Sequence, residues 1–362
     1  MRGMRRLMLS CVTAFAFSLA MAAPGYAGTV SQSPGITING NSGFLTCGCA
    51  TGAGTASNPY VVGPFAIISP NSGNSAVTIE NTTADFVLTG ISVNYTDANP
   101  LHPVVNLTNV AGPATISNLS ANGDGMGVEI YNSSNITLDS INVNKMLGTG
   151  IYIYGSTNVA LSNGKYKATA DGEPAHEEDG LYAVNSSHIS IGGLRACPTS
   201  TPCNTFDYDS GYGVYLQNTN SVTINNASAN ADDTGSYILD GSNTYNVNLT
   251  NSTGEGGGPI CITVNGTKVP TGYANTDLVG GVMLVNGAHN NTISGDNFTG
   301  MSSLSGYNIA SGGNPFYYNV CTAGDVSGFQ ATDTAMGSGN TFSNNCYSTT
   351  DVADLPPSTC KS

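Results

Sequence analysis

The chain has 362 residues and a formal net charge of −14, with 46 glycines, no tryptophan and only 9% charged residues. Nine Lys and Arg residues stand against 23 Asp and Glu residues. Because contacts to phosphates need many cationic side chains, this balance argues against a nucleic acid partner. It also argues against long polyanions as ligands unless metal ions bridge them.

Residues 1–27 have the pattern of a secretory signal. A basic start precedes an apolar run over residues 7–22, and a small-x-small motif ends at Ala27, with cleavage after Ala22 as the alternative. The run is too short to span a membrane, and no later stretch is long and apolar enough. We therefore expect a secreted protein, periplasmic or extracellular, without an integral membrane segment. The signal carries three arginines, so the mature chain keeps six basic against 23 acidic residues, a net charge of about −17.

Eight cysteines follow the predicted signal, and an even number in an exported chain favours disulfides over metal ligation. Cys197 and Cys203 bracket a short loop that a local bridge would close. A single residue separates Cys47 from Cys49, so we expect these two to pair elsewhere in the chain. The eight are Cys47, Cys49, Cys197, Cys203, Cys261, Cys321, Cys346 and Cys360.

Three segments are predicted after the signal. Residues 28–75, rich in Gly, Ser, Pro and Thr, form a lead-in and an N-terminal cap. Such a cap is expected because an exposed terminal strand invites pairing with other chains. Residues 76–346 hold a series of repeats, and residues 347–362 form a C-terminal strap tied down by Cys360. No separate second domain is expected.

The repeats are clearest at residues 127–138, GVEIYNSSNITL. Close copies begin at Gly150, Gly180 and Gly213, and looser copies are GSYILDGSNTYNVNL and GVMLVNGAHNNTI. Alternating polarity within each copy predicts two short strands joined by an Asn/Ser turn. One copy cannot bury its own apolar face, so neighbouring copies must stack. The sequence therefore predicts an all-β parallel solenoid of about nine or ten rungs.

Counting from each leading glycine assigns the side chains to two sides of the stack. The positions one and three after it are apolar in the close copies and should point inward, as in Val128 and Ile130. The fifth position should form a ladder at a turn, because Asn tolerates left-handed backbone. Its members are Asn132, Gly155, Asn185, Asn218, Asp240 and Asn286.

The glycine-led rung GxxxxNSxNVxI resembles the repeat of pectate-lyase-like proteins and of periplasmic NosD-like proteins. The resemblance covers roughly residues 76–345 and implies a single-stranded right-handed parallel β-helix. That fold hosts lyases, hydrolases, epimerases, adhesins and binding proteins, so function must be argued from a site.

The second position after each glycine should point outward and carries mostly tyrosine. It holds Glu129, Tyr152, Tyr182, Tyr215 and Tyr237, with Tyr131 and Tyr154 two residues further along the same side. At a strand spacing of about 4.8 Å these rings would form a continuous stripe. Aromatic faces pack well against sugar rings, which indicates polysaccharide as the partner. The alternative is that the tyrosines only stabilise neighbouring strands as ladder pairs.

Acidic residues gather just before the same strands. We expect four to be candidate catalytic acids: Asp179, Asp209, Asp232 and Asp233. Acids in matching corners would lie about 5 or 10 Å apart, a range that includes the carboxylate separations of glycosidases. Crowding would keep one of them protonated as a general acid. The same corners suit calcium as a cofactor, and ordinary turn chemistry is the remaining alternative.

Asp232-Asp233 resembles the paired aspartates of polygalacturonase-type hydrolases, although no GHG or RIK-like motif follows. Pectate lyases combine calcium-binding acids with an Arg or Lys base, and Arg195 is the one arginine outside the signal. Basic residues are therefore too scarce to favour a lyase or an epimerase. We expect binding of a neutral or weakly charged polysaccharide and, in a catalytic version, its hydrolysis. The alternative is a non-catalytic β-helix module of the cell envelope or surface.

Overall fold

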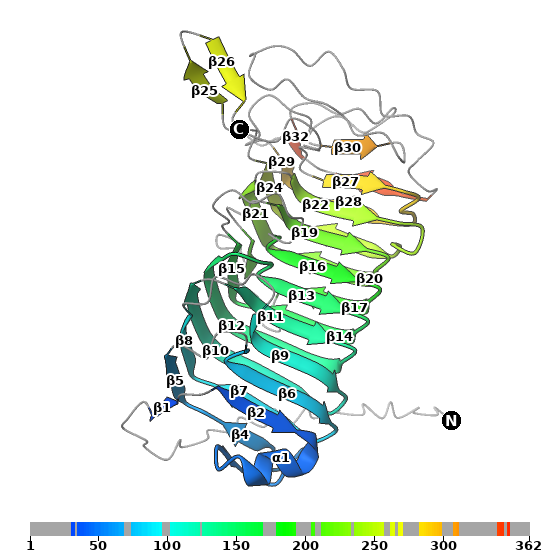
Figure 1. The fold of residues 1–362 in the computed structure, drawn as a ribbon. Helices are drawn as coiled ribbons and strands as arrows, with labels where there is room; N and C mark the ends of the chain where they lie inside the picture. The colour runs from blue at the N-terminus through cyan, green and yellow to red at the C-terminus, as the bar shows by residue number, and fades with distance from the viewer. Residues whose placement is uncertain are drawn as a thin grey trace, which may run out of the picture.

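The computed structural model shows a parallel β-solenoid, in which successive turns of chain stack from the N-terminal to the C-terminal end (Figure 1). The all-β fold class predicted from the repeats is confirmed. Within the described part of the chain, no helix is long and apolar enough to cross a membrane. The structure describes residues 30–32, 35–68, 74–95, 102–123, 125–168, 179–192, 204–206, 211–232, 235–256, 261–264, 267–270, 282–298, 307–310, 339–343 and 346–347.

One sheet contains ten parallel strands and faces the viewer in Figure 1. Its strands pair in chain order, so each is the next turn of the solenoid. They are β2 (Ile36–Asn39), β6 (Val77–Thr82), β9 (Pro103–Val110), β11 (Met126–Tyr131), β13 (Ile151–Tyr154), β16 (Leu181–Val184), β19 (Tyr212–Gln217), β22 (Gly235–Asp240), β27 (Val282–Val285) and β30 (Tyr307–Ala310).

The second sheet has twenty strands in two stacks, joined where β10 (Ala114–Gly123) and β12 (Ser134–Met146) run through both. The first stack adds β3 (Ala50–Thr51), β4 (Tyr60–Val62), β7 (Phe86–Thr89), β14 (Thr157–Ser162), β17 (Ser187–Ile191), β20 (Asn220–Asn225), β23 (Val247–Thr250), β28 (Thr292–Ser294) and β31 (Thr341–Ser343). The second adds β1 (Val30–Gln32), β5 (Phe65–Ile68), β8 (Ile91–Tyr95), β15 (Gly164–Ala168), β18 (Asn204–Thr205), β21 (Ala227–Asp232), β24 (Thr253–Gly256), β29 (Asn297–Phe298) and β32 (Cys346–Tyr347). A separate antiparallel pair consists of β25 (Cys261–Val264) and β26 (Thr267–Pro270).

The regular part of the solenoid is shorter than predicted. Register partners in the ten-stranded sheet lie 28, 23, 23, 30, 33 and 23 residues apart between Val77 and Tyr237. These separations define about six regular turns rather than nine or ten rungs. The pairings beyond them span 41 residues from Ile36 to Val77 and 45 residues from Tyr237 to Val282. Longer connections therefore interrupt the repeat at both ends, although strands still pair there. The stack also begins before residue 76, the predicted start of the repeats.

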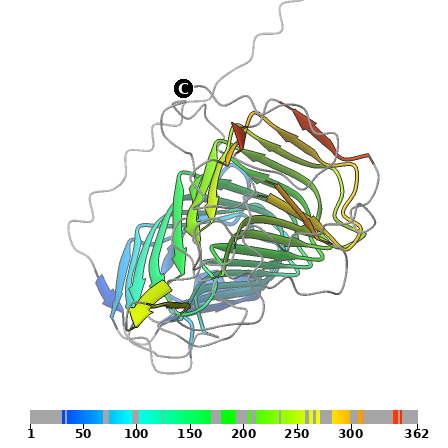
Figure 2. The same cartoon turned by 90° about the horizontal axis from the view of Figure 1, so that it is seen from above.

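The inward side chains of the strands fill the space that the sheets enclose in Figure 2. The predicted inward positions of the four close copies are confirmed, because each is at most 1% exposed. They are Val128, Ile130, Ile151, Ile153, Leu181, Ala183, Val214 and Leu216. Close packing between turns explains why glycine leads the repeat, since a Cβ on Gly127 would lie 2.1 Å from the carbonyl oxygen of Gly150 in the next turn.

A ladder of buried hydroxyl groups, here called the hydroxyl ladder, forms the corner that follows the ten-stranded sheet. Its members are Ser133, Ser156, Ser186, Thr219 and Thr244, each at most 3% exposed. The Ser156 hydroxyl accepts the backbone N–H of Ser133 at 3.0 Å and donates to the Tyr154 carbonyl at 2.8 Å. Ser186 and Thr219 repeat both contacts in the following turns. Each corner is therefore tied to the next through one side chain.

The predicted asparagine ladder lies beside the hydroxyl ladder, with one correction. Asn132, Asn185, Asn218 and Asn286 all have φ between 47° and 53°. Gly155 takes the same place in its turn. A side chain there would clash with the ladder, since a Cβ on Gly155 would lie 2.5 Å from Asn132 Oδ1. Asp240 is not a member: Gly241, with φ of 97°, stands against Asn218 instead. Gly235 pairs with Tyr212 rather than with the leading Gly213, so counting from Gly235 misplaces this residue by one.

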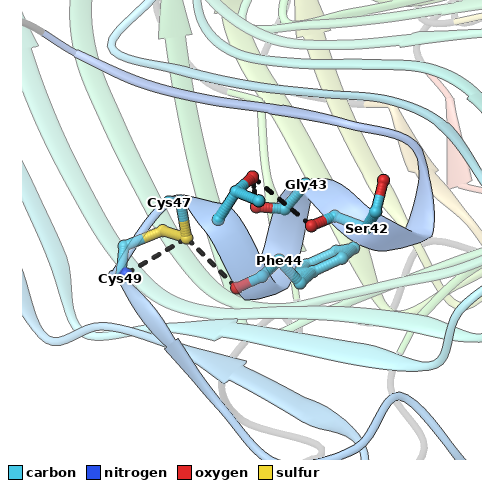
Figure 3. The surroundings of a disulfide bond; sticks show 6 residues. Ser42, Gly43, Phe44, Cys47 and Cys49 are labelled. Atoms are coloured by element: carbon cyan, nitrogen blue, oxygen red, sulfur yellow. Dashed lines mark hydrogen bonds between the residues drawn. A yellow bond between two sulfur atoms is a disulfide. The ribbon is translucent and has the colours of Figure 1, made fainter.

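The N-terminal end of the stack is covered by α1 (Gly40–Thr46), at the bottom of Figure 1. Phe44 of this helix is 1% exposed, and its ring stacks on Tyr60 with centroids 4.6 Å apart. The expectation that Cys47 and Cys49 pair elsewhere is wrong, because a disulfide joins them to each other (Figure 3). Gly48 has φ of 64°, and this left-handed residue lets the two Cα atoms approach to 5.1 Å. The other predicted cysteine contacts lie outside the described side chains.

The hydroxyl ladder gives a stability prediction. Replacing Ser156 by Ala leaves the buried N–H of Ser133 without its acceptor, which should lower the free energy of unfolding by about 1–3 kcal/mol. Urea titration followed by circular dichroism measures the change. The matched control is Ser190→Ala on β17, an exposed serine whose loss should cost less than about 0.5 kcal/mol. Equal effects of the two substitutions would contradict a structural role for the ladder.

Candidate functional site

The outward side of the ten-stranded sheet carries the predicted tyrosine stripe. The register pairs Glu129 with Tyr152, Tyr152 with Tyr182, and Tyr182 with Tyr215 in successive turns. Tyr131 and Tyr154 pair two residues further along, as the alternation predicts. With Tyr212 at the start of β19, these tyrosines form what we call the tyrosine face: Tyr131, Tyr152, Tyr154, Tyr182, Tyr212 and Tyr215.

The rings of the tyrosine face contact one another without a break. Two pairs are stacked, Tyr131 on Tyr154 with centroids 4.9 Å apart and Tyr182 on Tyr215 with centroids 4.7 Å apart. Tyr152 connects the two pairs, at 6.4 Å from Tyr154 and 5.6 Å from Tyr182. Tyr131 is 36% exposed and the other rings are partly exposed. The face is therefore a continuous, accessible aromatic surface.

Tyr237 does not belong to this surface, and its predicted outward position is wrong. It pairs with the inward Val214, is fully buried, and donates its hydroxyl to the Thr253 carbonyl at 3.0 Å. Ile238 occupies the outward place next to Tyr215. The strand β22 is shifted by one residue relative to the glycine-based alignment, and a shift of one residue exchanges the two sides of a strand.

The same shift brings Asp240 to the outward side, where it ends a polar network that the sequence did not reveal. Asp240 Oδ2 accepts the hydroxyl of Tyr215 at 2.7 Å and Nε2 of Gln217 at 3.1 Å. Its Oδ1 accepts Nδ2 of Asn286 at 2.6 Å. Gln217 Oε1 in turn accepts the hydroxyl of Tyr182 at 2.8 Å. Four turns of the solenoid thus contribute to one cluster at the end of the tyrosine face.

Burial and nearby carboxylates change the acidity of groups on this face. Burial, followed by the charge of Asp179, raises the pKa of Tyr182 to about 12. Burial and the hydrogen bond to Asp240 hold the pKa of Tyr215 far above its usual range. Burial also raises the pKa of Glu129, which lies between Asn106 and Tyr152 in the register. The phenols of Tyr182 and Tyr215 are therefore neutral hydrogen-bonding groups at neutral pH.

Of the four predicted catalytic acids, the structure describes only the side chain of Asp179. Asp179 is 2% exposed, and its Oδ1 accepts the backbone N–H of Tyr212 at 2.7 Å. Asp232 is the last residue of β21, but its side chain lies outside the described residues, as do Asp209 and Asp233 entirely. Among the described residues, no group of three or more His, Cys, Asp or Glu side chains could hold a metal ion. The carboxylate pair and the calcium site stay predictions.

Comparison with known proteins adds little to this site. No family model matches the chain, and no curated protein matches it. Among solved structures, Geobacillus virus E2 ORF18 is similar at 12% identity and a TM-score of 0.43, over 76% of this chain but only 61% of the viral protein. The A-module of Azotobacter vinelandii mannuronan C-5 epimerase AlgE6 is similar at 10% identity and a TM-score of 0.38, over 87% and 82% of the two chains. The periplasmic alginate epimerase AlgG is similar at 12% identity and a TM-score of 0.32, over 79% and 75%. All three TM-scores lie below 0.5, so these likenesses carry no argument about this chain.

The raised pKa of Tyr182 predicts a specific alkaline titration. A free tyrosine ionises near pH 10, whereas Tyr182 should ionise near pH 12. The folded state favours the neutral phenol of Tyr182. The contribution of this phenol to the free energy of unfolding is therefore complete below about pH 10 and is lost as the pH rises through about 12. The ultraviolet tyrosinate titration of Tyr182→Phe should lack one transition near pH 12 relative to the wild type. If the transition that Tyr182→Phe lacks lies near pH 10 instead, the raised pKa of Tyr182 is contradicted.

Proposed function

We propose that the mature protein binds a neutral or weakly charged polysaccharide along the tyrosine face. The observation that carries this proposal is the unbroken line of six phenol rings across β11, β13, β16 and β19. Four adjacent strands extend over about 14 Å, which suits an elongated ligand better than a single small one. Aromatic faces supply large contact area to the apolar faces of sugar rings.

Ring stacking also stabilises neighbouring strands, so a purely structural role is the first alternative. Two observations favour a ligand instead. The inward sides of these strands are already packed, and the corners are tied by the hydroxyl ladder, so register does not depend on the tyrosines. The rings nevertheless stay partly exposed to solvent, which leaves their faces available for contact.

Charge favours a neutral ligand over an acidic one. None of the ten strands of this sheet contains a lysine, arginine or histidine. Within the described residues, the outward side carries the carboxylates of Glu80, Glu129 and Asp240. A surface that offers carboxylates and no cation from its strands disfavours a polyanion.

Hydrolysis of the bound chain is the catalytic extension of this proposal. Asp232 ends β21, and β22 begins at Gly235, so Asp232 and Asp233 directly precede a strand of the tyrosine-bearing sheet. We assign general acid and nucleophile or base roles to members of the set Asp179, Asp209, Asp232 and Asp233, with one acid protonated. Calcium bound by acids of these corners is the alternative use of the same groups.

A non-catalytic binding module of the cell envelope or surface is the second candidate function. The burial of Asp179 and its hydrogen bond to the Tyr212 backbone favour it, because they give this acid a structural role. In both candidates, we propose that residues 1–27 direct export.

Removing rings from the tyrosine face should weaken binding. Tyr182→Ala and Tyr215→Ala should each lower the affinity for a bound polysaccharide about two- to tenfold, because each ring loses its contact with a sugar. Affinity electrophoresis in gels that contain single polysaccharides measures the change. Tyr245→Ala is the matched control, since this ring stacks on His289 outside the ten-stranded sheet. Unchanged binding in both face variants would contradict the proposal.

The two candidate functions differ in turnover. If the chain is a hydrolase, Asp232→Asn with Asp233→Asn should lower the release of reducing ends about hundredfold or more while the protein still folds. Circular dichroism verifies the fold, and a reducing-end assay with and without calcium measures turnover. Unsaturated products would point to a lyase instead. Binding by the wild type without any product would establish the non-catalytic module.

A further inference from the structure

The polar network at the end of the tyrosine face has a fixed direction. A carboxylate accepts hydrogen bonds and donates none, so Gln217 must turn its Nε2 toward Asp240, 3.1 Å away. That orientation places Gln217 Oε1, also an acceptor only, against the Tyr182 hydroxyl at 2.8 Å. The amide orientation is therefore set by the chemistry of its neighbours and not by a choice between its two similar ends.

Both tyrosine hydrogens are consumed by this arrangement. The Tyr182 hydroxyl must donate to Gln217, and the Tyr215 hydroxyl must donate to Asp240 at 2.7 Å. The Tyr215 oxygen also accepts Nε2 of Gln217 at 3.2 Å, so any lone pairs that remain on the two phenol oxygens can only accept further hydrogen bonds. Burial supports this protonation state, because it raises the pKa of both phenols. Asp240 itself is 8% exposed and is held by three donors, so the network is rigid.

We infer that Asp240 is a specificity-determining residue. It makes this end of the tyrosine face accept hydrogen bonds, so the face selects a neutral glycan, whose hydroxyl groups donate, over a uronate glycan. The inference rests on the proposed polysaccharide function and names the substrate class of that site. A sugar hydroxyl can donate to the phenol oxygens, whereas a carboxylate can only accept and meets lone pairs. Glu129, at the other end of the same side, adds a second acceptor when it is ionised.

The test uses pairs of ligands that differ only in this chemistry. Neutral oligosaccharides of glucose, mannose and galactose are compared with the same compounds after their primary alcohols are oxidised to carboxylates. Isothermal titration calorimetry gives both dissociation constants for each pair. The wild type should bind at least one neutral compound about tenfold or more tightly than its oxidised form, the factor expected for one hydrogen bond to a charged network.

Asp240→Asn should reduce that preference about tenfold. Asparagine supplies an Nδ2 donor where the carboxylate only accepted, so the tyrosine hydrogens are free to turn toward the ligand. The matched control is Glu129→Gln, which removes one negative charge from the same side without touching the network. If both variants change the preference equally, overall charge and not hydrogen-bond direction sets the specificity, and the inference is overturned.

A second variant keeps the inference testable if Asp240→Asn fails to fold, which circular dichroism detects. Tyr182→Phe retains the ring and loses the accepting oxygen, so affinity for the neutral compound should fall about fivefold or more while affinity for the oxidised compound changes less. Equal losses for both compounds would overturn the inference. A wild type that binds neutral and oxidised compounds alike also overturns it and leaves the proposed function standing. Binding of none of the compounds overturns both.

Discussion

Hydrogen bonds between one turn and the next fix the register of every strand, and the hydroxyl ladder fixes where each turn leaves the ten-stranded sheet. A hydroxyl of this ladder accepts from the preceding turn and donates within its own, as Ser156 does between Ser133 and Tyr154. The side-chain period of a strand is two, so a slip of one residue would bury the tyrosines and expose the aliphatic core. The chemistry of the outward side therefore depends on a buried corner of the solenoid.

The repeat pattern was sufficient to predict the solenoid, the inward pairs and most of the tyrosine face. These predictions hold wherever the copies keep the same number of residues between the leading glycine and the corner. They fail at β22, because Gly235 pairs with Tyr212 and Ser236 takes the place that the leading glycine has in the other copies, which shifts the count by one residue. Alternating polarity gave no signal of this shift, because the structure buries all four residues of this stretch, Ser236, Tyr237, Ile238 and Leu239, to at most 2% exposure.

Contacts that depend on a local backbone state or on register between distant turns were harder to predict. The spacing of Cys47 and Cys49 suggests that they are too close to pair. In the structure, Gly48 adopts a left-handed conformation that turns the chain between them and allows the disulfide. The network of Asp240 joins residues from four turns, and Tyr182 lies 35 residues before its partner Gln217. Sequence spacing does not reveal such a cluster, because insertions of different length separate the turns and only the paired strands show which residues meet.

Under the proposed function, affinity and selectivity depend on different chemical groups of this surface. The exposed phenol rings supply contact area, and almost any sugar ring with an apolar face can use it. The direction of the hydrogen bonds is set elsewhere, by the buried carboxylate at the end of the chain that runs from Tyr182 through Gln217 to Asp240. Because Asp240 cannot donate, Tyr215 and Gln217 donate to it and Tyr182 donates to Gln217, so the phenol oxygens can only accept further hydrogen bonds. Under the proposed function, loss of a ring lowers the affinity for any glycan, whereas reversing the direction of the hydrogen bonds requires a change at the buried acid.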